Sequence, residues 1–378
     1  MKILHLAHGP FQGLPAHFMD MERRFGQKAE MVFFQGHAPS GGVEIPQILL
    51  DIYPIRFFRK WQVRHRVVDA NRRLMSPTET DLQVPKTPIT QLHPNLGQRW
   101  WRHLKNNRMR KKIPGIISKY QLSGYDVVHF DGARDLTHEA DLAAALKREG
   151  AKIVSVFYGT ELRVDGVTPA LDRLSNLNLT MEFDHIFLHP NIHYLPAPFE
   201  APATVEKTKL NSPLRIVHAP SMRYNKGTDL ILPVIERLKS RYRFEFVLVE
   251  GLPQTECRII KAGCDLCIDQ IGNRGGTGYG VGSLEMLAQG IPCVSDFTER
   301  FRDFLPGNPF YVTDADGLEA TLATILENPE SLLERGRKSR AWVEATHGYR
   351  AVYTRLLEIY AKVGISPAST NLQDSLKP

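Results

Sequence analysis

A glycine-rich stretch in the C-terminal half of the chain has the composition of a phosphate-binding loop. Six glycines lie between Gly272 and Gly282. A buried strand is predicted before them at residues 265–270, a short helix after them at 283–289, and a further strand at 291–295. Glycines bring backbone amides close to a ligand without obstruction by Cβ, and a helix N-terminus carries about half a positive charge. The pattern therefore predicts a phosphate site rather than an ordinary surface turn.

An acidic residue, Glu285, follows this loop. It falls in the first turn of the predicted helix, where its carboxylate can accept hydrogen bonds from the paired hydroxyls of a ribose while the loop amides hold a diphosphate. We therefore expect a nucleoside diphosphate here. The expected contacts are Gly275, Gly276, Thr277, Gly278, Tyr279, Gly280 and Glu285.

A second segment offers polar groups for the same ligand. Residues 214–227 predict a buried strand and a loop, and residues 228–240 predict a helix with one apolar face. The loop carries Ser221, Arg223 and Lys226. Open α/β sheets bind ligands at the C-terminal ends of their strands, which is where Lys226 and the glycine-rich loop are expected. Lys226 is therefore a candidate phosphate ligand, and the other interpretation is a solvated loop lysine.

The segment TGYGVGSLEMLAQGIPCVSD, residues 277–296, resembles the donor-site block of retaining glycosyltransferases with the GT-B fold. These enzymes form the large sucrose-synthase and mannosyltransferase-like family, glycosyl transferases group 1. Of the two glutamates in the family block, the ribose-binding one matches Glu285, and the one that touches the transferred sugar falls on Thr277. The family's diphosphate-binding Lys-Gly pair matches Lys226 and the glycine after it. Its arginine falls on Ser221, and Arg223 lies two residues further on.

The N-terminal half resembles the family more weakly. Residues 2–7 predict a strand, and residues 8–15 a loop before a helix that runs to about residue 25. In the family this loop lies against donor and acceptor, which implies roles for Gly9 and Gly13. Strands at 126–130 and 152–157 flank a predicted helix at 137–149. The next block resembles a family motif that faces the reacting sugar, with Tyr158 in place of His and Glu161 in place of Asp. The other interpretation of Tyr158 is a residue that caps the sheet end.

The resemblance implies an α/β fold of two Rossmann-like doubly wound domains that face a cleft, and 378 residues suffice for two cores. We expect an acceptor-binding domain at 1–197 and a nucleotide-sugar-binding domain at 213–348. A linker at 198–212 joins them, a helix at 349–363 crosses back to the first domain, and a disordered tail covers 364–378. No segment has the ~20 apolar residues of a membrane span, and the N-terminus predicts a strand instead of a signal peptide, so a cytoplasmic protein is expected.

A basic insertion is predicted at residues 52–125. It holds sixteen Lys or Arg and three acidic residues, a local net charge of +13, although the whole chain carries +7. Residues 56–75 and 99–117 can both form basic helices with interleaved aromatics, among them Trp61, Trp100 and Trp101. Such helices bind anionic lipid surfaces, each cation contributing ~1 kcal/mol. We expect peripheral docking on the inner face of a membrane; a solvated basic surface is the alternative. Nucleic acid is disfavoured because no base-reading motif accompanies the charge.

No metal and no cofactor is expected. The candidate blocks lack an Asp-x-Asp pair. Prolines interrupt the segment that carries His185, His189 and His193, so these histidines do not share a metal-binding helix. Cys264 and Cys267 have the spacing of a zinc or redox pair, but no second pair accompanies them, and we expect buried, reduced thiols.

The expected function is transfer of a sugar from a nucleoside-diphosphate sugar to a lipid-linked or otherwise anionic saccharide, with retention and without a metal, in polysaccharide or glycoconjugate biosynthesis. Lys226 would offset the charge on the departing diphosphate. Two alternatives remain. One is a GT-B sugar-nucleotide 2-epimerase, for which the basic insertion has no role. The other is a catalytically weak membrane-associated scaffold, suggested by the departures at Thr277, Ser221 and Tyr158.

Overall fold

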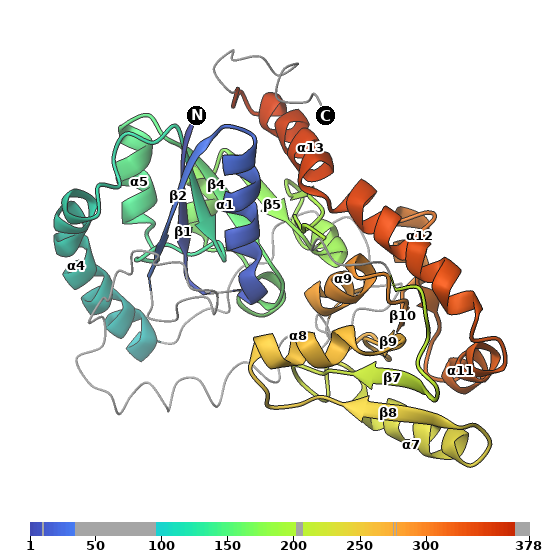
Figure 1. Cartoon of the computed structure of the whole chain (residues 1–378). Coiled ribbons are helices and arrows are strands. Elements are labelled where there is room, and N and C mark those ends of the chain that lie inside the picture. The colour runs from blue at the N-terminus through green and yellow to red at the C-terminus, as the bar shows by residue number, and fades with distance from the viewer. Residues whose placement is uncertain (10, 35–95, 202–206, 275, 277, 367–378) are drawn as a thin grey trace. The chain divides into compact units, whose positions relative to one another are not determined.

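The computed structural model describes residues 1–9, 11–34, 96–201, 207–274, 276 and 278–366, and the chain forms two compact units (Figure 1). Of the described residues, the first unit comprises 1–9, 11–34, 96–198 and 352–366, and the second comprises 199–201, 207–274, 276 and 278–351. The predicted basic helix at 56–75 and residues 367–378 of the predicted tail lie outside the described residues.

The first unit is built on a parallel sheet of six strands in the order β2-β1-β3-β4-β5-β6. Its strands are β1 Lys2–Ala7, β2 Lys28–Phe33, β3 Val127–Asp131, β4 Lys152–Phe157, β5 Leu177–Thr180 and β6 His193–Tyr194. The strands predicted at 2–7 and 152–157 are confirmed. β3 is buried along its whole length, as expected of a parallel sheet with helices on both faces.

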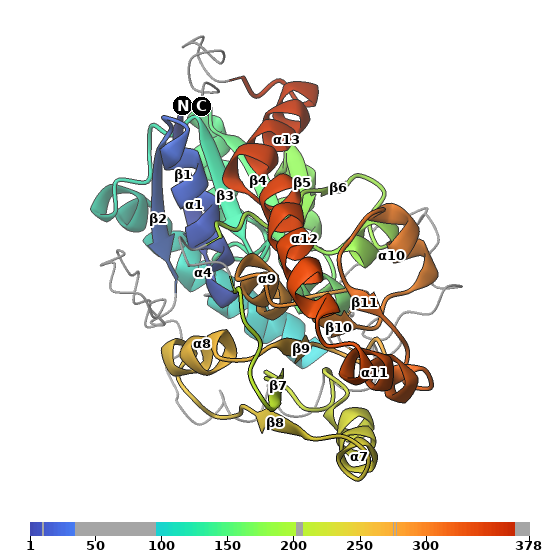
Figure 2. The ribbon, with the colours of Figure 1, turned by 45° about the vertical axis from the view of Figure 1, so that its right-hand side comes forward.

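Helices cover both faces of this sheet (Figures 1 and 2). α1 (Leu14–Arg24) and α13 (Tyr349–Lys362) lie on one face. α4 (Leu96–Lys119), α5 (Asp141–Arg148) and α6 (Pro169–Leu174) lie on the other. Three short helical turns complete the unit: η1 Phe11–Gly13, η2 Glu161–Asp165 and η3 Phe183–Phe187.

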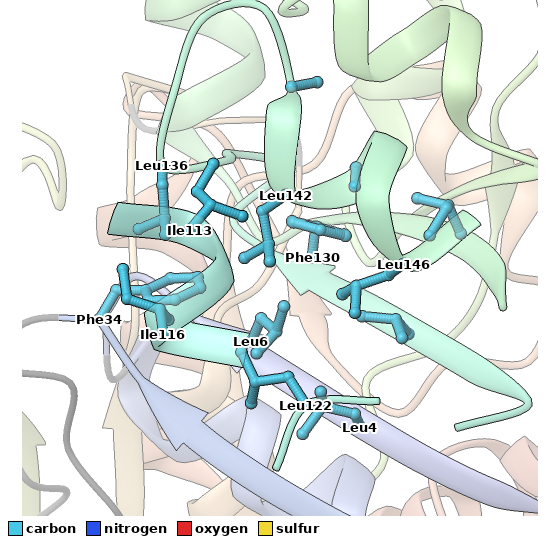
Figure 3. Close-up of a cluster of buried hydrophobic side chains, with 14 of the residues drawn as sticks. Leu4, Leu6, Phe34, Ile113, Ile116, Leu122, Phe130, Leu136, Leu142 and Leu146 are labelled. Atoms are coloured by element: carbon cyan, nitrogen blue, oxygen red, sulfur yellow. The ribbon is translucent and has the colours of Figure 1, made fainter. Parts of the chain in front are cut away.

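The α4 helix is held by a regular apolar face. Met109, Ile113 and Ile116 recur at three- and four-residue spacing and are buried against the sheet, where they meet Leu6 and Phe130 (Figure 3). The predicted basic helix at 99–117 is thus confirmed within α4. Among the described residues, no helix is both long and apolar enough to cross a membrane.

The second unit has a parallel sheet of five strands in the order β11-β10-β9-β7-β8. The strands are β7 Leu214–His218, β8 Phe244–Leu248, β9 Leu266–Ile268, β10 Cys293–Ser295 and β11 Tyr311–Val312. The helices are α7 Thr228–Lys239, α8 Gln254–Ala262, α9 Val281–Ala288, α10 Glu299–Phe304, α11 Leu318–Glu327 and α12 Ser331–Thr346. α7 and α11 pack together over one face of the core, and α9 packs against α8 and α12.

Two predicted helix starts are wrong. The helix predicted at 137–149 begins only at Asp141, because Ala140 has a left-handed φ of 56° that interrupts helical geometry. The helix predicted at 283–289 begins earlier, at Val281, with Gly280 as its N-cap. Both starts lie beside glycines or turns, where propensity gives little information.

Candidate functional site

The strand order of the second unit locates its ligand-binding edge. β7 lies between β8, which follows it in the chain, and β9, so the sheet changes direction between β7 and β9. Ligands of doubly wound sheets bind beyond the C-terminal ends of the strands at such a switch point. The loops that leave β7 and β9 carry Lys226 and the glycine-rich stretch, so the topology brings both predicted blocks to one edge.

Lys226 lies in a polar cluster at this edge. Its ammonium donates to Asp269 Oδ1 at 2.7 Å and to Gln270 Oε1 at 3.2 Å. Asp269 Oδ2 accepts from the Ser283 hydroxyl at 2.7 Å and from the Gly280 amide at 3.3 Å. We call these five residues the cradle. Burial alone would raise the pKa of Asp269, but Lys226 and the hydrogen bonds lower it below its usual value, so the group is a carboxylate at neutral pH.

Glycines are required at two positions beside the cradle. Gly227 has a φ of 67°, and a Cβ there would lie 2.0 Å from the backbone oxygen of Ile271. Gly278 has a φ of 130°, and its Cβ would lie 2.3 Å from the ring of Phe301. The Gln270 side-chain amide also donates to the Gly278 carbonyl. These positions hold the cradle in place by close backbone approach.

The other predicted loop residues have different surroundings. Gly276 is buried with a φ of 113°, whereas Gly275 and Thr277 lie outside the described residues. The Tyr279 ring packs in an aromatic cluster and stacks on Phe310 at 5.0 Å between ring centroids. Its hydroxyl lies 2.8 Å from His347 Nε2. The Tyr279 side chain is thus part of the packing behind the loop.

Glu285 does not lie in the first helical turn, so that prediction is wrong. Because α9 begins at Val281, Glu285 falls in the second turn. Its carboxylate is buried, accepts from Arg258 Nε at 3.0 Å, and also accepts from the Lys261 ammonium. Burial would raise the pKa of Glu285, but the two cations of α8 lower it. Its role as ribose ligand stays a prediction, and no pattern in the sequence indicates these two partners.

The other two candidate residues of the β7–α7 loop, Ser221 and Arg223, are exposed. Arg223 forms a two-point ion pair with Glu250, at 2.7 Å from Nε and 2.6 Å from the terminal nitrogen. Ser221 is exposed nearby in the chain. Both cations of the β7–α7 loop, Arg223 and Lys226, are therefore already paired with a carboxylate.

In the first unit, the predicted residues Gly9 and Gly13 follow β1. Gly13 has a φ of 85° and precedes α1, a position that favours glycine. A Cβ at Gly9 would lie 3.6 Å from the Phe11 ring. β1 and β3 flank the switch point of this sheet. Both glycines thus lie at the ligand-binding edge that topology predicts for this unit.

Tyr158 and Glu161 both make internal contacts. The Tyr158 ring is buried and stacks on Phe11 at 4.9 Å between centroids, and its hydroxyl donates to Asp131 Oδ1 at 2.6 Å. Glu161 accepts from the backbone amides of Tyr158 and Gly159, the latter at 3.0 Å. These contacts match the alternative in which Tyr158 caps the sheet end. A direct role of either residue toward a sugar stays a prediction.

A buried charge network beneath Tyr158 was missed at the sequence level. His5 lies 3.0 Å from Asp131 through Nδ1 and 2.8 Å from Glu22 through Nε2, and all three side chains are fully buried. Burial lowers the pKa of His5, but the two carboxylates raise it to about 10. His5, His129 and Asp131 have ligand atoms within 4.8 Å of one another, as in a metal site. Both nitrogens of His5 are engaged by carboxylates, so an imidazolium accounts for this cluster without an ion.

This network predicts alkaline destabilisation. His5 has a folded pKa of about 10 against an ordinary 6.5, so its ion pairs contribute fully below pH ~6.5 and are lost as pH rises through 10. We expect the thermal midpoint of the wild type to fall over this window by more than that of His5→Gln. The lost ion pairs correspond to a few kcal/mol of unfolding free energy. An equal fall of the thermal midpoint with pH in the wild type and in His5→Gln would contradict an ionised His5.

Cys264 and Cys267 are buried, as predicted, and His185 and His193 do not share a helix. Cys264, Cys267 and Cys293 are buried, Cys257 is half-buried, and all four are free thiols. Burial raises the pKa of Cys264 to about 11, so this thiol stays protonated. His185 lies in η3 and His193 in β6, so they share no helix.

The fold has clear relatives among solved structures. No protein-family model and no curated protein matches the chain. HepE of Anabaena, solved with UDP-glucose, is 14% identical, with 96% of this chain and 100% of that chain covered and a TM-score of 0.54. The chain has the GT-B fold. Sucrose-phosphate synthase from Thermosynechococcus elongatus is 11% identical, with 96% and 99% covered and a TM-score of 0.58. S. aureus TarM, solved as a mutant with fondaparinux, alpha-GlcNAc-glycerol and UDP, is 9% identical, with 95% and 100% covered and a TM-score of 0.60.

The fold class predicted from the sequence, two Rossmann-like domains of the GT-B type, is confirmed by these matches. At this level of identity the matches establish the fold.

Proposed function

We propose that this protein is a glycosyltransferase that moves a sugar from a nucleoside-diphosphate sugar to a saccharide acceptor, with retention and without a metal. The observation that carries the proposal is the ammonium of Lys226, fixed at the switch point beside Gly280 and the N-terminus of α9. As the sugar leaves, negative charge grows on the diphosphate. A positioned ammonium, backbone amides and a helix N-terminus can stabilise that charge together. The GT-B fold, shared with proteins solved in complex with UDP, supports the same chemistry.

The remaining predicted residues take supporting roles in this proposal. Lys226 holds the leaving diphosphate, and the glycine-rich loop supplies amides beside it. Arg223 is held by Glu250 through two of its guanidinium nitrogens and would meet the diphosphate with the N–H bonds that this pair does not use. Glu285 binds the ribose from a position already braced by Arg258 and Lys261.

Nucleotide binding tests the donor site directly. We expect the protein to bind UDP or GDP in calorimetry and Glu285→Ala to weaken that binding by ~2 kcal/mol, the cost of losing a charge-assisted hydrogen-bond pair. Arg258→Ala is the matched control, because it removes one brace of Glu285 but leaves the carboxylate. In the wild type the Arg258 side chain is half-exposed, so Arg258→Ala should weaken nucleotide binding less than Glu285→Ala does. Unchanged affinity in Glu285→Ala would remove this residue from the site.

The basic α4 helix supports a membrane-associated acceptor. It contains no acidic residue, and its outer stripe places Trp100 and Leu104, which are 64% and 40% exposed, in line with Arg108 and Lys111. An exposed aromatic ring beside cations suits the interface of an anionic bilayer. We therefore include a lipid-linked or anionic saccharide as acceptor and peripheral docking on the inner face of a membrane as the setting.

Vesicle co-sedimentation tests this docking. Binding should rise with the fraction of anionic lipid and fall only partly with salt, because screening weakens the cations but not the burial of Trp100. The triple change of Arg108, Lys111 and Lys112 to Gln should reduce binding. Arg110 is left in place because it pairs with Asp141 at 2.8 Å.

A control variant changes three exposed cations elsewhere to Gln and should sediment like the wild type. These are Lys209, Arg243 and Lys362. Equal losses in both variants would indicate a general charge effect. Equal sedimentation of the wild type with neutral and anionic vesicles would contradict docking through α4.

A further inference from the structure

The ammonium of Lys226 is oriented by two acceptors from the end of β9. Asp269 Oδ1 lies at 2.7 Å and Gln270 Oε1 at 3.2 Å, and the lysine side chain is only 17% exposed. An ammonium has three N–H bonds, so these contacts direct two of them and leave the third. A Cβ at Gly280 would lie 3.4 Å from Nζ, and the absence of a side chain there keeps that flank of the ammonium open.

Asp269 is itself rigidly held. It is 8% exposed, and its second oxygen accepts from Ser283 at 2.7 Å and from the Gly280 amide at 3.3 Å. The resident carboxylate therefore already occupies donors that a phosphate would use: a lysine ammonium and an amide at the N-terminus of α9. A bound diphosphate would enter a site whose positive charge is reduced by one.

We propose that Asp269 is the positioning residue for Lys226, and that its charge limits how tightly the product nucleotide is held. This inference rests on the proposed function. A lysine side chain has high rotamer entropy, so a buried carboxylate that fixes its ammonium before the donor arrives removes that cost from the chemical step. The same charge opposes an anionic product, which favours its release.

The exposed pair of Arg223 and Glu250 is a weaker candidate for a carboxylate that positions a phosphate-binding cation. Both side chains are reached by solvent, with 58% and 32% exposure, so water and salt screen their interaction. Asp269 acts from a nearly buried position, where the charge is felt more strongly.

The test is the isosteric variant Asp269→Asn, which keeps the side-chain size and removes the charge. We expect kcat to fall at least ~10-fold, without a rise in KM for the donor, since a misplaced lysine acts in the transition state. We also expect UDP or GDP to bind roughly 10-fold tighter, because a negative charge a few ångströms from the diphosphate is gone. A merely structural role would not tighten binding. Asp303→Asn is the matched control: it makes the same isosteric, charge-removing change at an exposed position of α10 outside the cradle, so affinity should change less than about two-fold.

A double-variant cycle tests whether Asp269 acts through Lys226. In the Lys226→Ala background, Asp269→Asn should lower kcat no further. Additive losses, wild-type kcat in the single variant, or weaker nucleotide binding would each overturn the proposal. If Asp269→Asn does not fold, Asp269→Glu keeps the charge but moves the carboxylate by one methylene from its place beside Lys226, and an unchanged kcat there would overturn the positioning claim. A wild-type protein that neither binds nucleotides nor turns over would instead overturn the proposed function itself.

Discussion

Replacing Lys226 by alanine is expected to lower kcat about 100-fold while the protein remains folded. Lys226 lies in a loop and is not a member of the hydrophobic core of the second unit, so its loss should act on the leaving group and not on the core. Removing one donor from a site that stabilises developing charge typically costs 10²–10³-fold in rate. Steady-state kinetics with the preferred donor would measure this effect, and the thermal midpoint would confirm folding.

Lys239→Ala is the matched control for this prediction. Lys239 ends α7, the helix that begins two residues after Lys226, and it pairs with Glu236 at 2.8 Å on the surface. Its kcat should equal that of the wild type. Full turnover in Lys226→Ala would remove this lysine from the chemistry, whereas loss of soluble protein would point to a structural lysine.

Gly227→Ala is expected to lower both stability and activity. Alanine at a φ of 67° costs about 1 kcal/mol in strain, and its Cβ would lie 2.0 Å from the Ile271 oxygen, so the backbone of the β9–α9 loop must move. We expect a total loss of about 3 kcal/mol or more, seen as a lowered thermal midpoint. Displacement of the loop by ~1 Å would also lower kcat ~10²-fold.

Gly251→Ala separates strain from the steric clash. Gly251 has nearly the same φ, 69°, but a Cβ there meets no atom within 4 Å. This variant should lose only the ~1 kcal/mol of strain and keep its activity. If both variants behave alike, the close approach of the two loops is not what places Lys226.

The strands were predicted well because they are continuous apolar runs. β1 and β4 have the predicted bounds, and β9 and β10 lie within theirs. Parallel strands buried on both faces carry this signal in the sequence itself. α4 could be predicted for a similar reason, because its apolar stripe of Met109, Ile113 and Ile116 can be recognised within one short segment.

The partners of the site residues could not be predicted. Asp269 and Glu250 lie about forty and thirty residues from the cations they bind, and Lys261 reaches Glu285 from another helix. Such pairings depend on how strands and helices are stacked, which periodicity does not encode. His5 and His129 were missed for the same reason: they face each other only through the register of β1 and β3.

The start of α9 was misplaced because two glycines precede Ser283. Glycine disfavours helix interiors, so the sequence predicted a later start. In the structure Gly280 is the N-cap and Gly282 falls in the first turn, where amides need no helical partner and the conformational penalty is tolerated. This shift moved Glu285 to the second turn.

The most direct test of the account is donor turnover. The protein would be incubated with UDP, GDP and ADP sugars, with and without lipid-linked saccharide, and free nucleotide would be measured. We predict nucleotide release from one donor that rises several-fold when the acceptor is present and that is lost in Lys226→Ala. A changed sugar nucleotide without acceptor would identify a 2-epimerase. No release from any donor, by a protein that sediments with anionic vesicles, would contradict the glycosyltransferase assignment and favour a scaffold.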